Sequence, residues 1–169
     1  MILAVDAQYQ KDGSGHVAGV LFKDVVDAEP LFSGSIQLYH VAPYEPGQFY
    51  KRELPGILQM FHMIHERYSD ISLIVIDGYV DLGLDHPGLG RHLFHALGGM
   101  VPVLGVAKTQ FKDAPALEVV RGFSKKPLFV TSAGLILGAD AALVRLMHGT
   151  YRIPTMLKLV DHKARQGLK

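Results

Sequence analysis

Two short apolar runs, each ending in an aspartate, set the strongest limit on how this chain can fold. Residues 72–77 read Ser-Leu-Ile-Val-Ile-Asp, and residues 2–6 read Ile-Leu-Ala-Val-Asp. Runs this short and this rich in Ile, Leu and Val are typical of buried β-strands. An acid at the C-terminal end of such a strand lies where an α/β sheet opens to solvent. Asp6 and Asp77 can therefore meet across neighbouring strands, an arrangement that suits a divalent metal ion.

The composition is that of a folded chain of ordinary domain size. Of the 169 residues, 49% are hydrophobic and 20% are charged, which favours a single domain over residues 1–169. The chain has no cysteine, which excludes a disulfide scaffold and a thiolate metal site. Its start lacks the features of a signal peptide, and no run reaches the roughly 18 apolar residues of a membrane span. We expect a cytoplasmic monomer with no membrane partner.

Strand and helix patterns follow one another in an order typical of a mixed α/β fold. The first three strands read as an antiparallel meander, and the later strands, which alternate with helices, are expected to be parallel. Between residues 78 and 90 the sequence predicts a long loop rich in glycine and acids, of the kind that is often functional. Strands are expected at 1–6, 17–22, 31–39, 72–77, 101–107, 117–120 and 128–131, and helices at 51–68, 89–97, 138–147 and near the C-terminus.

Further candidate residues lie at the ends of predicted elements. Glu53 is placed at the start of a helix, where the helix dipole would help it to stay ionised. Lys108 follows the strand 101–107, so it belongs to the same sheet edge as the two aspartates. Oxygen ligands on a rigid sheet suit Mg²⁺ or Mn²⁺, and Lys108 would add positive charge for a phosphate. His86 could contact a phosphate or transfer a proton. Taken singly, Glu53 also fits a common helix-start residue and Lys108 a surface residue.

Two polar segments are open to simpler interpretations. Residues 43–47 read Pro-Tyr-Glu-Pro-Gly, a stiff loop that holds Tyr44 between two prolines. From the local pattern alone, a turn with an exposed tyrosine explains this segment. Arg121, Lys125 and Lys126 form a basic cluster, for which a solvated surface is the simplest interpretation. The net charge of +1 is low for a nucleic-acid-binding domain.

Taken together and in order, a set of short motifs resembles the endonuclease V family. Each motif is weak alone, but their order and spacing are specific, and they span nearly the whole chain. The matching segments are Val5-Asp6 with Tyr9, Pro43–Gly47, Arg52–Pro55, Asp77-Gly78, His86-Pro87, Gly105–Lys108, Thr131–Gly134, Tyr151–Pro154 and Asp161.

The resemblance implies a ribonuclease-H-like fold and a Mg²⁺- or Mn²⁺-dependent endonuclease. Members of this family cut a nucleic-acid strand 3′ of a deaminated purine, one nucleotide beyond the lesion, in the repair of damaged DNA. By resemblance, Asp6 and Asp77 are metal ligands, and Glu53 is the third acid, which binds the metal or orients a water molecule. Lys108 and His86 match the family's catalytic lysine and histidine.

The resemblance also implies substrate-binding residues. Tyr44 and Pro46 match a wedge that holds the two strands apart while the base is turned out, which costs little for the weakly paired hypoxanthine. Gly78 and Gly90 are expected to line the base pocket. The expected substrate is inosine in DNA, and RNA is left open as an alternative.

The chain departs from the family pattern around the expected lesion pocket. Residues 79–85 look like an insertion, Gly88 replaces an arginine, and Leu135 replaces a histidine. Two other functions therefore stay open. One is a module of the same fold that binds a modified base without cutting. The other is a metal-dependent nucleotide phosphohydrolase, for which a strand-separating tyrosine would have no use.

Overall fold

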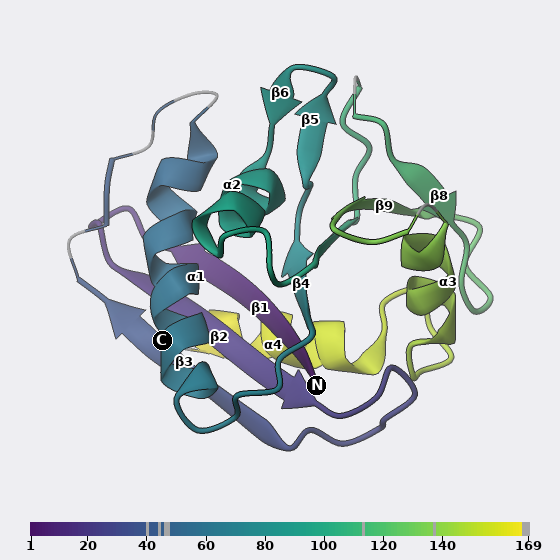
Figure 1. Cartoon of the computed structure of the whole chain (residues 1–169), viewed down its shortest axis with the longest axis horizontal. Coiled ribbons are helices and arrows are strands. Elements are labelled where there is room, and N and C mark those ends of the chain that lie inside the picture. Colours follow the sequence, from purple (N-terminus) through teal and green to yellow (C-terminus); the bar gives the residue numbers. More distant parts are fainter. Residues whose placement is uncertain (40, 44, 46–47, 113, 137, 167–169) are drawn as a thin grey trace.

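The fold is built on a seven-stranded sheet, shown in Figure 1. The computed structural model describes residues 1–39, 41–43, 45, 48–112, 114–136 and 138–166. The strand order is β3-β2-β1-β4-β7-β9-β8, and β5 and β6 form a separate two-stranded sheet. The strands are β1 Ile2–Tyr9, β2 Gly15–Phe22, β3 Phe32–Leu38, β4 Leu73–Asp77, β5 Asp81–Gly83, β6 His86–Pro87, β7 Val103–Ala107, β8 Leu117–Val119 and β9 Leu128–Ala133. The helices are α1 Phe49–His65, α2 Leu89–Ala96, α3 Ala139–Leu146 and α4 Thr155–Gln166.

The strand directions confirm the predicted mixed sheet and correct one part of it. Strands β1, β2 and β3 form the expected antiparallel meander, and β1, β4 and β7 run parallel. The expectation of parallel strands is wrong for β9 and β8, because β9 runs antiparallel to both β7 and β8. The reason is the connection from β7 to β9, which carries β8 and turns instead of a crossover helix. A parallel neighbour needs such a crossover.

The register of the sheet places the two strand-end aspartates side by side. Val5 on β1 pairs with Ile76 on β4, so the next residues along these parallel strands are Asp6 and Asp77. Asp77 in turn pairs with Val106 on β7, which puts Lys108 at the same edge, two residues further along.

Helices cover both faces of the sheet, as Figure 1 shows. Helices α1 and α2 pack on one face through buried residues that include Ile57, Met60 and Leu93. Helices α3 and α4 contribute Val144 and Val160 to the core on the opposite face. The C-terminal ends of the parallel strands β1, β4 and β7 therefore lie between the two helical layers. No described helix is long and apolar enough to cross a membrane.

The segment after Asp77 forms a hairpin, where the sequence predicted a loop. Strands β5 and β6 pair there in antiparallel fashion and project from the sheet in Figure 1. The N–H of Val80 donates to Thr131 Oγ1 at 2.8 Å, which ties the base of the hairpin to β9. A side chain at Gly105 would lie 2.6 Å from the carbonyl oxygen of Gly78. Gly105 is therefore required for the chain to cross β7 directly after Asp77.

The prediction that Arg121, Lys125 and Lys126 form a solvated basic cluster is wrong for Arg121. Arg121 is only 6% exposed, and its guanidinium donates to the carbonyl oxygens of Met147, Gly149 and Tyr151. These groups include carbonyls at the end of α3, which have no partner within the helix. Arg121 is thus a structural residue that holds the segment after α3 against the strand β8.

Candidate metal centre

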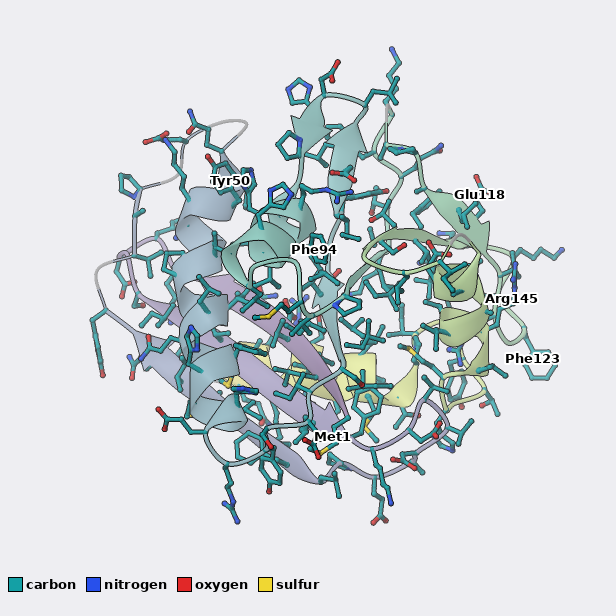
Figure 2. All side chains as sticks on the ribbon, in the orientation of Figure 1. Met1, Tyr50, Phe94, Glu118, Phe123 and Arg145 are labelled. Carbon is teal, nitrogen blue, oxygen red and sulfur yellow. The ribbon has the colours of Figure 1, made fainter. Side chains whose placement is uncertain are left out.

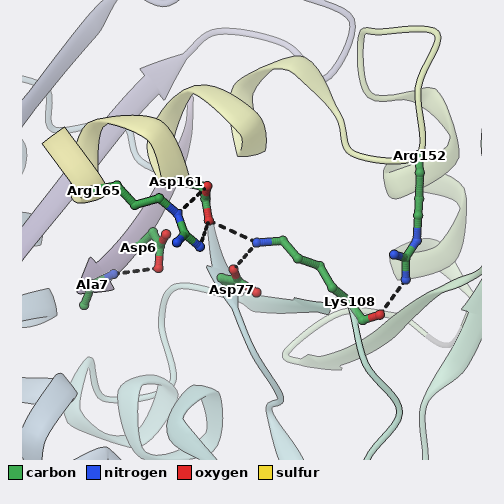
Figure 3. Close-up of polar contacts among 7 residues, drawn as sticks. All are labelled: Asp6, Ala7, Asp77, Lys108, Arg152, Asp161 and Arg165. Atoms are coloured by element: carbon green, nitrogen blue, oxygen red, sulfur yellow. Dashed lines mark hydrogen bonds and ion pairs between the residues drawn. The ribbon is translucent and has the colours of Figure 1, made fainter. Parts of the chain in front are cut away.

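Three aspartates from three separate elements meet at the carboxyl edge of the central strands. Asp6 ends the buried part of β1, Asp77 ends β4, and Asp161 lies on α4. One carboxylate oxygen from each lies within 4.8 Å of the others, and Figure 3 shows the group. Oxygens that share a Mg²⁺ ion at ligand distances of about 2.1 Å lie up to about 4.2 Å apart. The spacing is therefore close to that of a metal centre.

Asp6 has one carboxylate oxygen without a hydrogen-bond partner among the described residues. The residue is 7% exposed, and its Oδ1 accepts a hydrogen bond of 2.7 Å from the N–H of Ala7. Its Oδ2 is buried and, among the described residues, has no partner. Burial and then the neighbouring charge of Asp77 raise the pKa of Asp6 from 3.8 to about 6. A buried anionic oxygen is costly unless a cation or a donor pairs with it.

Lys108 lies between the other two aspartates. Its Nζ donates to Asp77 Oδ2 at 2.7 Å and to Asp161 Oδ1 at 3.1 Å. Partial burial works against the charge of Lys108, but the bonds to Asp77 and Asp161 outweigh it and raise the lysine pKa. Arg165, one helical turn beyond Asp161, donates to both oxygens of Asp161 and lowers its pKa. Asp161 is thus held ionised and fixed in orientation.

Arg152 fixes the backbone from which Lys108 projects. Its guanidinium donates to the carbonyl oxygens of Lys108 and Pro127, and the first of these bonds is drawn in Figure 3. The bonds join the end of β7 to the residue before β9. Arg152 therefore acts as a positioning residue for the lysine and contacts none of the three aspartates in Figure 3.

Glu53 faces the aspartates from α1, but it is not held in the ionised state that the sequence suggested. The helix begins at Phe49 and has no acid in its first turn, so Glu53 lies beyond the part of the helix where the dipole acts. Burial and then the charges of Asp6 and Asp77 raise the pKa of Glu53 from 4.5 to about 7. Among the described residues, the carboxylates whose oxygens lie within 4.8 Å of one another include that of Asp161 and not that of Glu53.

Tyr9 holds the start of α1 against β1, beside Glu53. Its hydroxyl donates to the carbonyl oxygen of Arg52 at 3.2 Å. The guanidinium of Arg52 lies 4.5 Å from the centre of the Tyr9 ring. Burial and then the charge of Glu53 raise the pKa of Tyr9, so Tyr9 stays a hydrogen-bond donor at neutral pH.

The remaining predicted site residues lie elsewhere or outside the described residues. His86 is exposed on β6. It does not belong to the set of three aspartates found among the described residues. Gly78 has a φ of +146° with open space beside its Cα. Gly90 is buried in α2, where a side chain would meet Val80 at 2.7 Å. Tyr44 and Pro46, the predicted wedge, lie outside the described residues.

The charge of the centre favours a divalent cation. Asp6, Glu53, Asp77 and Asp161 carry four negative charges when ionised, and Lys108 and Arg165 supply two positive ones, which leaves −2. Burial first, and then the charges of the neighbouring acids, favours protonation of Asp6 and Glu53, which reduces this negative charge. A divalent cation would relieve it as well and would give the orphaned oxygen of Asp6 a partner. The residues present therefore fit a Mg²⁺ or Mn²⁺ ion.

The sequence did not single out Asp161 as a site residue. It stood among the motif residues, yet its local pattern, an aspartate four residues before an arginine on a helix, is that of an ordinary surface ion pair. Only the packing of α4 across β1 and β2 brings it to the sheet edge.

Comparisons with known proteins agree on one family. The family model for endonuclease V matches residues 1–141. The endonuclease V of Rhodospirillum centenum is 35% identical over 128 residues, which cover 72% of this chain and 50% of that protein. The chain thus matches about half the length of this curated relative. The match to the family model ends before α4, so it does not include Asp161.

Solved structures extend the likeness in fold to 99% of the chain. Endonuclease V of Ciona intestinalis, in complex with a 24mer DNA containing an inosine followed by a ribo-adenosine, has a TM-score of 0.84 at 17% identity, with 85% of that chain covered. Human endonuclease V has a TM-score of 0.82 at 19% identity, with 83% of that chain covered. Both confirm the ribonuclease-H-like fold.

Proposed function

The chain belongs to the endonuclease V family, and from this premise we propose that it is a Mg²⁺- or Mn²⁺-dependent endonuclease. Its substrate would be a nucleic-acid strand containing a deaminated purine, with hydrolysis of a phosphodiester bond 3′ of inosine, one nucleotide beyond the lesion. The observation that carries the proposal is the group of three aspartates with a buried, unpartnered oxygen on Asp6. A relative that only bound a modified base would have no use for such a centre.

The residues of the centre can divide the chemistry among them. Asp6, Asp77 and Asp161 would hold the ion, which as a Lewis acid would stabilise negative charge on the phosphate. Glu53, with a pKa near 7, is suited to accept a proton from an attacking water molecule. Lys108 already contacts two of the ligands and would place its charge beside the phosphate as negative charge develops there.

The substrate part of the proposal rests on the relatives. The complex of the Ciona protein contains inosine in DNA, and weak pairing makes hypoxanthine cheap to turn out of a duplex. Tyr44 and Pro46 are proposed to separate the strands, and Gly78 and Gly90 to line the base pocket. The open space beside Gly78 is consistent with a base lying close to the backbone there. His86 as a catalytic residue, the single domain and the monomeric state stay predictions.

A single gel assay tests the proposal. Labelled inosine-containing duplex DNA, inosine-containing RNA and free ITP are incubated with the protein in Mg²⁺, in Mn²⁺ and in EDTA. We expect one cut on the 3′ side of inosine, only when a metal is present. Asp77→Ala should abolish the cut. Asp70→Ala is the matched control, because Asp70 is an exposed aspartate near the opposite end of β4.

The outcomes separate this proposal from its two rivals. Cutting that survives in Asp77→Ala would refute the assigned metal centre. Hydrolysis of free ITP without strand cleavage would indicate a nucleotide phosphohydrolase instead. Binding of the inosine strand with no cut under any metal would indicate a module that recognises the base and leaves the strand intact.

A further inference from the structure

A groove opens beside the carboxylate centre, on the side of α4. It has a volume of about 580 Å³ and shares two lining residues, Lys108 and Asp161, with the centre. Its other lining residues include Phe123, Tyr151 and Lys158. None of these three is used by the chemistry proposed above. The groove therefore starts at the proposed reaction site, at Lys108 and Asp161, and extends away from it past Phe123, Tyr151 and Lys158.

Two aromatic side chains in this groove are largely exposed to solvent. Phe123 is 98% exposed and Tyr151 is 73% exposed. Figure 2 shows Phe123 projecting away from the turn that precedes β9. Neither ring contributes to the two hydrophobic core clusters of the described residues. The fold gains nothing from exposing them, so their place beside the centre calls for another explanation.

The backbone beneath the two rings is held firmly. The buried Arg121 donates a hydrogen bond of 2.9 Å to the carbonyl oxygen of Tyr151. Gly122 has a φ of +58°, and a side chain there would collide with the carbonyl oxygen of Thr150. The turn that carries Phe123 thus lies directly against the segment that carries Tyr151. The backbone positions of the two aromatic residues are therefore fixed relative to each other before any ligand binds.

We propose that this groove binds nucleotides next to the cut, with bases stacked on Phe123 and Tyr151. The inference rests on the endonuclease function proposed above and deepens it. Aromatic rings stack on any base, because every base has a π-face. The exposed Lys158 in the groove, with Lys125 and Lys126 in the adjoining turn, supplies the positive charge that a phosphate backbone requires.

The position of the groove beside the carboxylate centre favours a nucleic acid over a protein segment. An exposed apolar surface that docks a protein would not need to end at a group of carboxylates and a lysine. A strand whose phosphate reaches Lys108 and the aspartates must continue past them, and this groove begins at Lys108 and Asp161. A nucleic-acid strand of several nucleotides would occupy the carboxylate centre and the groove at the same time.

The test compares Phe123→Ala, Phe123→Trp and Tyr151→Ala with the wild type. Kinetics are measured on an inosine-containing strand with long flanks and on one trimmed close to the lesion. Stacking on such rings is worth roughly 5- to 150-fold in affinity per base. We expect KM for the long strand to rise about 5-fold or more in each alanine variant, with kcat unchanged, since binding is lost equally from ground and transition states. Phe123→Trp should retain the wild-type KM.

Controls separate a lost stacking contact from a general effect. Met100→Ala removes an apolar side chain that is 82% exposed and precedes β7, at the opposite end of that strand from Lys108, so its KM should not change. For the trimmed strand, wild type and Phe123→Ala should have the same KM. Anisotropy of a labelled oligonucleotide in EDTA measures binding apart from cleavage and should show the same ranking of variants.

Two results decide between this inference and the proposed function. If the wild type cuts inosine strands and both alanine variants match its KM and affinity, the groove proposal is overturned and the endonuclease proposal stands. If the wild type cuts nothing yet binds oligonucleotides through Phe123, the endonuclease proposal fails and the groove proposal stands.

Discussion

Replacing Asp6 with asparagine should make the metal-free protein more stable and remove its response to metal. In the folded chain the pKa of Asp6 rises from 3.8 to about 6, mainly through burial and secondly through Asp77. Folding therefore favours the protonated form. The free energy of unfolding should fall as pH rises from about 4 to about 6 and stay low above that range. The change in the pKa of Asp6 from 3.8 to about 6 corresponds to about 3 kcal/mol.

Asp6→Asn removes this charge and keeps the shape of the side chain. Its amide oxygen can still accept the hydrogen bond from Ala7 N–H, which is 2.7 Å long in the wild type. At mildly alkaline pH in EDTA, the variant should gain up to about 3 kcal/mol, or about 6 to 12 °C in Tm for a chain of this size. In the wild type, Mg²⁺ at 100 times its Kd should add about 2.7 kcal/mol, whereas Asp6→Asn should gain far less.

Thermal unfolding over a pH series, with and without Mg²⁺ or Mn²⁺, measures both effects. Asp140→Asn is a suitable control. Asp140 is also buried, but its oxygens accept hydrogen bonds from Ser132 and from the N–H of Ala141. That variant should not be stabilised and should respond to metal as the wild type does. An Asp6→Asn protein that is less stable than the wild type in EDTA, or equally stabilised by metal, would refute the reasoning.

Three further predictions concern pH, β9 and the end of α3. At subsaturating metal, kcat/KM should rise between about pH 6 and pH 7 and level off above it, because Asp6 and Glu53 must lose protons to act as ligand and base, and their pKa values in the metal-free protein are about 6 and about 7. A flat pH profile would contradict these roles. Thr131→Val removes the acceptor of the buried Val80 N–H and should lower the free energy of unfolding by about 1–3 kcal/mol, as measured by urea titration. Ser33→Val on β3 is the control and should not cause this loss. Arg121→Met leaves several carbonyl oxygens without their donor and should lower the free energy of unfolding by about 3 kcal/mol in the same titration. A loss smaller than the error of the titration would show that water replaces the guanidinium.

Local patterns predicted the elements well because they record burial. The runs that end at Asp6 and Asp77 are apolar at every position, and both are buried strands in the parallel centre of the sheet. The stripe of apolar residues after residue 53 belongs to α1. The hairpin of β5 and β6 was missed because these strands have only three and two residues, too few to show a period.

The direction of the last strands was missed for a different reason. Both parallel and antiparallel central strands read as continuous apolar runs when helices cover both faces. The run at β9 is almost wholly buried, as is the run at β7, yet it pairs antiparallel. Direction depends on the path of the connection, which the composition of a strand does not contain.

The two aspartates at the ends of buried strands could be predicted from the sequence, because a buried strand and its end are local features. What surrounds these aspartates depends on how distant segments pack. Asp161 joins them because α4 packs across β1 and β2, and Glu53 carries a raised pKa because α1 buries it beside them. Distance, burial and charge between segments far apart in the chain depend on packing, and they make two strand ends a candidate metal centre.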